Sequence, residues 1–303
     1  MAKQWLVSFH GGSKPTEHNN IHAYSDQGAP SSPDKVLDMT GAGQVQLDEL
    51  RGFGFYNGNL WVVNAHKSSS GILKFSGTAG SNGEYAFQQV FTAYDPSANP
   101  GLLHPFNFVF APDGNLYVSN QDTSCITRYY GPATTLPGEP IPSPNGPFPG
   151  TFIPPESSTA PNGLKTPRDL LFDMNGNLWV ADESLGLLNY SRPNGAFIGV
   201  LPGSNQWKPV HLLLNGTNLY VGCGADSSVQ LVNLEAGTSK QYLPPGAGGL
   251  DGPAGMALTT DHFYIANRKK QQVLRFRLSN GAPDSKPFIG AMGDDPEFML
   301  HLT

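Results

Sequence analysis

The chain has 303 residues, among them 36 glycines and 27 prolines, and only 14% of its residues are charged, whereas an average soluble domain carries about 25%. This much glycine and proline excludes coiled coils and helical repeats, and 38% hydrophobic and 11% aromatic residues exclude a charge-rich disordered chain. A fold of many short strands joined by turns remains.

The charge distribution excludes further classes of protein. The net charge is −6, and the densest basic cluster is the three-residue run 268–270, so the sequence predicts no binding to nucleic acid. No stretch approaches the ~20 apolar residues of a membrane-spanning helix. The first residues lack the apolar run of a secretory signal, so we expect a cytoplasmic protein, or a secreted one whose signal peptide was removed.

One sequence motif recurs along the chain: a short apolar strand, a turn, and a second strand that ends in a small or polar residue. Its first strand begins at five positions, namely Leu50, Pro105, Pro167, Pro209 and Pro253. Four of the five turns contain Asn-Gly or Asp-Gly, pairs that favour tight β-hairpins. A third apolar strand follows each hairpin, and a weaker fourth follows it, for example at 197–201. Four antiparallel strands form one blade of a β-propeller.

The two chain ends supply a sixth blade. Residues 5–9 have the pattern of a second strand with no first strand before them, and residues 296–302 have the pattern of a first strand with no second strand after them. The sequence therefore predicts an all-β, six-bladed propeller that uses residues 1–303 as one domain and is closed by the C-terminal strand. The proline-rich insertion at about 131–161 is expected to be a loop over a blade, with a docking segment as the alternative.

The sequence motif at 167–182, PRDLLFDMNGNLWVAD, resembles an NHL repeat. The chain as a whole also resembles the six-bladed propellers of the gluconolactonase, virginiamycin B lyase and strictosidine synthase types. The NHL pattern usually has glycine two residues after the proline. Here Asn107, Asp169 and His211 occupy that position in three successive blades, which departs from a purely structural repeat.

Chemistry is expected at one mouth of the central channel, because the starts of the first strands and the ends of the second strands meet there. Polar side chains gather in both sets of positions. The first-strand set is Arg51, Asn107, Arg168, Asp169, His211 and Glu297, and the second-strand set includes His66, Glu183 and Arg268. The recurring Asn64, Asn120, Asp182 and Asn267 are interpreted instead as caps of the following turns.

One possible mechanism uses a metal. The gluconolactonase resemblance implies an axial divalent ion held by Glu, Asn and Asp side chains directly after the prolines, where this chain offers only Glu297. A shifted set of Asn107, Asp169, His211 and Glu297 is the alternative, for calcium, magnesium or zinc. Such an ion would polarise a carbonyl group or activate water.

The other mechanism uses no metal. His211 acts as general acid or base, Asp169 orients it, and Arg168 or Arg51 holds an anionic substrate. Virginiamycin-lyase-like enzymes use His and Glu in a propeller mouth for elimination, but their histidine directly follows the proline, one residue before His211. Further ligand contacts are predicted from Asn107, Arg51, Glu183, Arg268 and His66.

Both mechanisms predict a small-molecule hydrolase or lyase. The alternative is a non-catalytic scaffold of the NHL type that binds a protein or a small ligand. An axis plugged by Phe106 and Phe298, beside a broad exposed apolar patch, would favour the scaffold.

Overall fold

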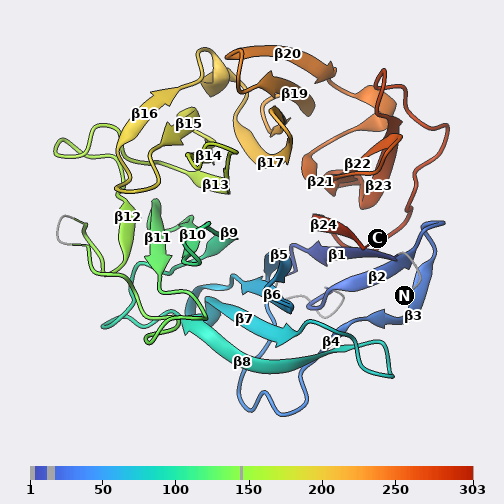
Figure 1. Ribbon diagram of the computed structural model, residues 1–303. Coiled ribbons are helices and arrows are strands. Elements are labelled where there is room, and N and C mark those ends of the chain that lie inside the picture. The colour runs from blue at the N-terminus through green and yellow to red at the C-terminus, as the bar shows by residue number, and fades with distance from the viewer. Residues whose placement is uncertain (1–3, 12–17, 144–145, 303) are drawn as a thin grey trace.

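Six β-sheets stand in a ring around a central axis (Figure 1), as the repeat predicts. The computed structural model describes residues 4–11, 18–143 and 146–302. The innermost strand of each blade faces the axis, and the later strands follow outward by antiparallel pairing. The chain is therefore a six-bladed β-propeller.

The first three blades are built as follows. The first consists of β24 (Pro296–Leu302), β1 (Gln4–Phe9), β2 (His22–Ser25) and β3 (Pro30–Lys35). The second consists of β5 (Leu50–Tyr56), β6 (Asn59–Asn64), β7 (Gly71–Ser76) and β8 (Tyr85–Ala93), with the short β4 (Leu37–Asp38) parallel to β8. The third consists of β9 (Pro105–Phe110), β10 (Leu116–Asn120), β11 (Cys125–Tyr129) and β12 (Thr151–Ile153).

The other three blades repeat this plan. The fourth consists of β13 (Pro167–Phe172), β14 (Leu178–Asp182), β15 (Gly186–Tyr190) and β16 (Phe197–Val200). The fifth consists of β17 (Pro209–Asn215), β18 (Asn218–Cys223), β19 (Ser228–Asn233) and β20 (Thr238–Leu243). The sixth consists of β21 (Pro253–Leu258), β22 (His262–Asn267) and β23 (Gln272–Arg277).

The ring closes through the two ends of the chain. β24 pairs antiparallel with β1, with His301 opposite Trp5 and Leu300 opposite Leu6. In Figure 1 the red C-terminal strand lies beside the blue N-terminal strand. The predicted composite blade is confirmed, and it covers two strand edges that would otherwise be free to pair with other chains.

The outer strands are the least regular part. In the sixth blade, two isolated bridges, Val273 to Ile289 and Phe276 to Pro283, stand in place of a fourth strand. The proline-rich insertion supplies β12, the outermost strand of the third blade. Proline lacks the amide hydrogen of a central ladder, so these proline-rich segments occupy the blade edge.

The core lies between neighbouring blades. One apolar cluster joins Trp61 and Phe91 of the second blade to Leu116 and Val118 of the third. The described residues contain four helices of three residues each, η1 (Lys67–Ser69), η2 (Ser204–Gln206), η3 (Ala247–Gly249) and η4 (Arg268–Lys270). Among these residues, no helix has the length and apolar character needed to cross a membrane.

Candidate functional site

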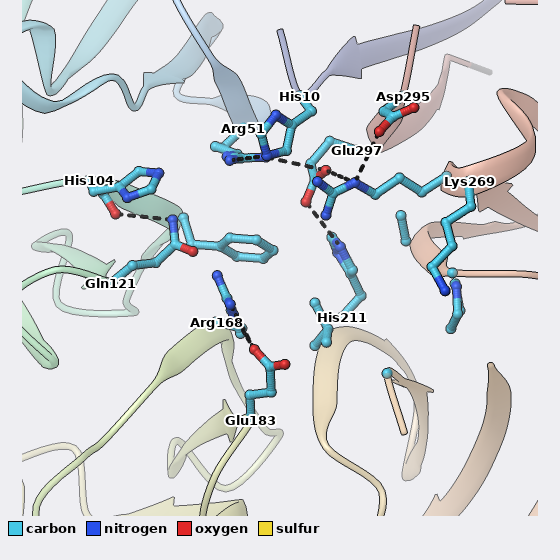
Figure 2. A pocket seen from close by; sticks show the side chains of 17 residues that line it. His10, Arg51, His104, Gln121, Arg168, Glu183, His211, Lys269, Asp295 and Glu297 are labelled. Atoms are coloured by element: carbon cyan, nitrogen blue, oxygen red, sulfur yellow. Dashed lines mark hydrogen bonds and ion pairs between the residues drawn. The ribbon is translucent and has the colours of Figure 1, made fainter. Parts of the chain in front are cut away.

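A polar pocket of about 510 Å³ opens where the first strands of the blades begin (Figure 2). All six blades contribute to it. Its lining residues are His10, Arg51, His104, Phe106, Gln121, Arg168, Glu183, Val210, His211, Gly224, Gly252, Pro253, Ala254, Arg268, Lys269, Asp295 and Glu297.

The Glu297 carboxylate is the centre of the charged groups on the pocket floor. Its Oε2 lies 3.2 Å from Arg51 Nη1 and 3.4 Å from Arg268 Nε, and its Oε1 lies 3.6 Å from His211 Nε2. Figure 2 shows the Arg51, His211 and Glu297 side chains converging from separate strands. Glu297 and Arg51 are almost completely buried, so the group is an ion cluster held away from water.

The charge state of Glu297 follows from two opposing effects. Burial raises the pKa of this carboxyl, but the Arg51 and Arg268 guanidiniums outweigh burial and bring the pKa below its usual range. Glu297 therefore carries a negative charge at neutral pH and faces the His211 imidazole with it.

Several atoms of this cluster lack hydrogen bonds. Within the described part of the chain, both Glu297 oxygens and Arg51 Nη1 make ion pairs but no hydrogen bond, and Arg51 Nε and His211 Nδ1 are buried without a hydrogen-bond partner. Buried polar groups in native proteins are nearly always hydrogen-bonded, and exceptions need a physical reason such as catalysis. Their concentration beside one pocket marks this floor as a candidate active site.

His10 extends the cluster. Arg51 Nη2 donates a hydrogen bond to His10 Nε2 at 2.9 Å, and His10 Nδ1 lies 3.1 Å from the Gly11 carbonyl oxygen. Burial, and then the charge of Arg51, lower the pKa of His10. A neutral imidazole that accepts at Nε2 and donates at Nδ1 fits both contacts.

The opposite wall is formed by Arg168 and Glu183. Arg168 donates to Glu183 Oε2 from Nε at 3.0 Å and from Nη2 at 2.7 Å. The Arg168 guanidinium also lies over the Phe106 ring, 5.7 Å from its centroid. The rings of Phe106, His211 and Phe298 pack together, with centroids 4.7–5.3 Å apart.

Asn107 and Asp169 lie behind the pocket lining. Asp169 accepts hydrogen bonds from the Leu170 and Leu212 amides, each at 2.8 Å, and from the Asn107 side chain. Burial raises the pKa of Asp169. These bonds tie three neighbouring blades together, and one of them reaches the Leu212 amide, which follows His211 on β17. The charged group directly beside the imidazole is Glu297.

The remaining predicted residues lie farther from the pocket. His66 is not among the lining residues, and its Nδ1 lies 3.8 Å from Glu49 Oε2. The predicted caps are confirmed for three residues: the Asp182 carboxylate accepts hydrogen bonds from two amides of the following turn, and the Asn64 and Asn120 side chains donate to carbonyl oxygens at the end of theirs. The Asn267 side chain instead bonds the Asp251 amide and the Gly249 carbonyl oxygen, in the loop before β21.

The predicted metal ligands have other partners in this structure. Asp169 uses both oxygens for amide donors, Asn107 Oδ1 accepts from the Phe108 amide, and Glu297 faces two arginines. No group of three or more His, Cys, Asp or Glu side chains within the described ranges has an arrangement that could hold a metal ion. These residues do not fit a metal ion in the arrangement that the structure shows. The divalent ion stays a prediction from the sequence.

Three titratable side chains of the lining were not singled out from the sequence as site residues: His104, Asp295 and Lys269. His104 and Asp295 directly precede the prolines that open β9 and β24. The position before each repeat proline is therefore a signal that could have found them.

Comparison with models of known families and with curated proteins finds no match. Solved structures match in fold. A chain of a nidogen/laminin complex is 13% identical, with a TM-score of 0.68 over 99% of this chain and 97% of that one. Virginiamycin B lyase from Staphylococcus aureus is 13% identical, with a TM-score of 0.50; the match covers 78% of this chain and 68% of that one. A streptogramin B lyase is 12% identical, with a TM-score of 0.51; the match covers 93% of this chain and 72% of that one. At these identities the likeness shows the propeller fold.

Proposed function

We propose that the chain is a small-molecule enzyme, a hydrolase or a lyase, and that His211 is its general acid or base. The observation that carries this proposal is the His211–Glu297 pair at 3.6 Å on the floor of a pocket that both residues line. A histidine beside a buried carboxylate is a common arrangement for proton transfer.

The geometry suggests how a proton would move. His211 Nε2 faces Glu297, so the nitrogen that takes a proton from a substrate C–H group or from a water molecule is Nδ1, which has no hydrogen-bond partner among the described residues. The resulting imidazolium is stabilised by the negative charge of Glu297, which also offsets repulsion from Arg51. The same nitrogen then returns the proton to the leaving group. Asp169 is a positioning residue, because its bond to the Leu212 amide fixes the strand that carries His211.

The test is a turnover screen of the purified protein with lactones, esters and substrates for elimination. His211→Gln should lower kcat by about 10²–10⁴-fold, the usual contribution of a general acid or base. His262→Gln is the matched control, because His262 lies on β22 outside this pocket. Equal turnover by His211→Gln and the unmodified protein would refute the assignment.

A binding scaffold is the second candidate. One observation favours it: the propeller that matches nearly the whole chain comes from a nidogen/laminin complex. A scaffold would bind its partner with the mouth intact and would show no turnover that depends on His211.

A further inference from the structure

The charged side chains of the mouth pocket differ in what an entering molecule can reach. Four cationic and three acidic side chains line the pocket. The Glu297 side chain is 0% exposed, whereas Arg268 and Arg168 keep 36% and 28% of their side-chain surface exposed. A ligand therefore meets these two guanidiniums, while Glu297 remains the buried counter-ion of Arg268.

The two exposed carboxylates of the lining are already engaged. Glu183 Oε2 accepts both hydrogen bonds from Arg168. Asp295 Oδ1 accepts from Gln271 Nε2 at 3.3 Å, and its Oδ2 lies 3.8 Å from Arg268 Nε. Arg168 keeps Nη1 for another acceptor, and within the described residues the Arg268 side chain donates no hydrogen bond. Donors thus outnumber the acceptors available to them.

An apolar surface adjoins these donors. Phe106, Val210, Pro253 and Ala254 line the pocket together, and Val210 is the one of the four that is not buried. The Arg168 guanidinium lies over the Phe106 ring, and a guanidinium is weakly hydrated and pairs with carboxylates through two parallel bonds. The pocket therefore offers charge-assisted donors next to an apolar wall.

We infer that this pocket binds a small organic carboxylate, with the carboxylate between Arg168 and Arg268 and the apolar body against Val210. This inference rests on the proposed function, because it names the substrate class of the same pocket. Bound in this way, the substrate would present its reacting carbon to His211, which directly follows Val210 on β17.

The test is an equilibrium titration at low salt, followed by calorimetry, with three probes: benzoate, the neutral isostere benzamide, and inorganic phosphate. Benzoate should bind at least ten-fold more tightly than benzamide, which lacks the charge, and than phosphate, which lacks the apolar body. Arg168→Met and Arg268→Met should each weaken benzoate binding about ten-fold or more. Circular dichroism confirms that each variant is folded.

Arg192→Met is the matched control. The Arg192–Asp113 pair is distant from the pocket lining and has side-chain exposures of 31% and 33%, close to the 28% and 34% of Arg168–Glu183. Equal binding of benzoate and benzamide, phosphate binding as tight as that of benzoate, no benzoate binding, or equal weakening by Arg192→Met would each overturn the inference. Benzoate binding without turnover in the screen would contradict the proposed enzymatic activity but not the carboxylate ligand. Turnover of neutral substrates without benzoate binding would contradict the carboxylate ligand but not the enzymatic activity.

Discussion

The Glu297 carboxylate offers the sharpest test of how the pocket floor is stabilised. Glu297→Gln keeps the shape of the side chain and removes its charge, which leaves Arg51, with a side chain only 4% exposed, without its acidic partner. Breaking a buried ion pair from one side costs about 3–5 kcal/mol of unfolding free energy. Arg268 adds little to this cost, because its side chain is 36% exposed.

Equilibrium urea unfolding, followed by tryptophan fluorescence, measures this loss. Asp113→Asn is the control: it breaks the exposed pair with Arg192 and should cost about 0–1 kcal/mol. The double variant Arg51→Met/Glu297→Gln should recover most of the loss, since an apolar replacement leaves no unpaired buried charge. The reasoning is refuted if Glu297→Gln costs no more than Asp113→Asn, or if the double variant is merely additive.

Three further predictions concern packing, pH and closure. Gly52→Ala should destabilise the fold by about 1–3 kcal/mol in urea unfolding, because a Cβ there would collide with the Asn107 side chain, and Asn107→Ala in the same chain should recover part of the loss. Burial lowers the pKa of His22 to about 4. Between about pH 6.5 and 4 the unfolded chain therefore binds a proton at His22 that the folded chain does not bind, and the free energy of unfolding should fall as the pH drops. Tm measured across this range should fall less in His22→Gln than in the unmodified protein. Deletion of β24 (Pro296–Leu302) should abolish the cooperative thermal transition seen by circular dichroism, since β1 loses its inner partner; a Tm unchanged by the deletion would contradict the closure argument.

The inner blade strands could be predicted because their burial leaves a pattern. The β6 strand, Asn59–Asn64, is buried over five of its six residues and reads as an apolar run after Asn-Gly. The outer strands leave a weaker pattern: β16 was predicted at 197–201, whereas the segment that contains β12 was expected to be a loop. β16 is largely exposed, and β12 has three residues within a proline-rich segment. The sequence therefore predicted six blades but not that bridges replace the fourth strand of the sixth.

The sequence predicted which end of the strands carries the candidate site better than it predicted which side chains point into the pocket. Arg51, Arg168, His211 and Glu297 line the pocket as expected, whereas Asp169 faces a neighbouring blade. Successive residues of a strand point to opposite sides, and the register is irregular at the start of β13, between Pro167 and Leu170. An irregularity of this kind redirects side chains by amounts that one sequence does not specify.

The plug formed by Phe106 and Phe298 on the axis supports the proposed enzyme more than the binding scaffold. Phe106 is 2% exposed and packs against both His211 and Phe298. The large exposed apolar side chains of the described residues lie elsewhere, three of them on β16, and none lines the mouth pocket. A scaffold needs its apolar surface at the contact face. A plug beneath a charged pocket instead excludes water from the His211–Glu297 pair, and this strengthens the electrostatic interaction on which the proposed proton transfer depends.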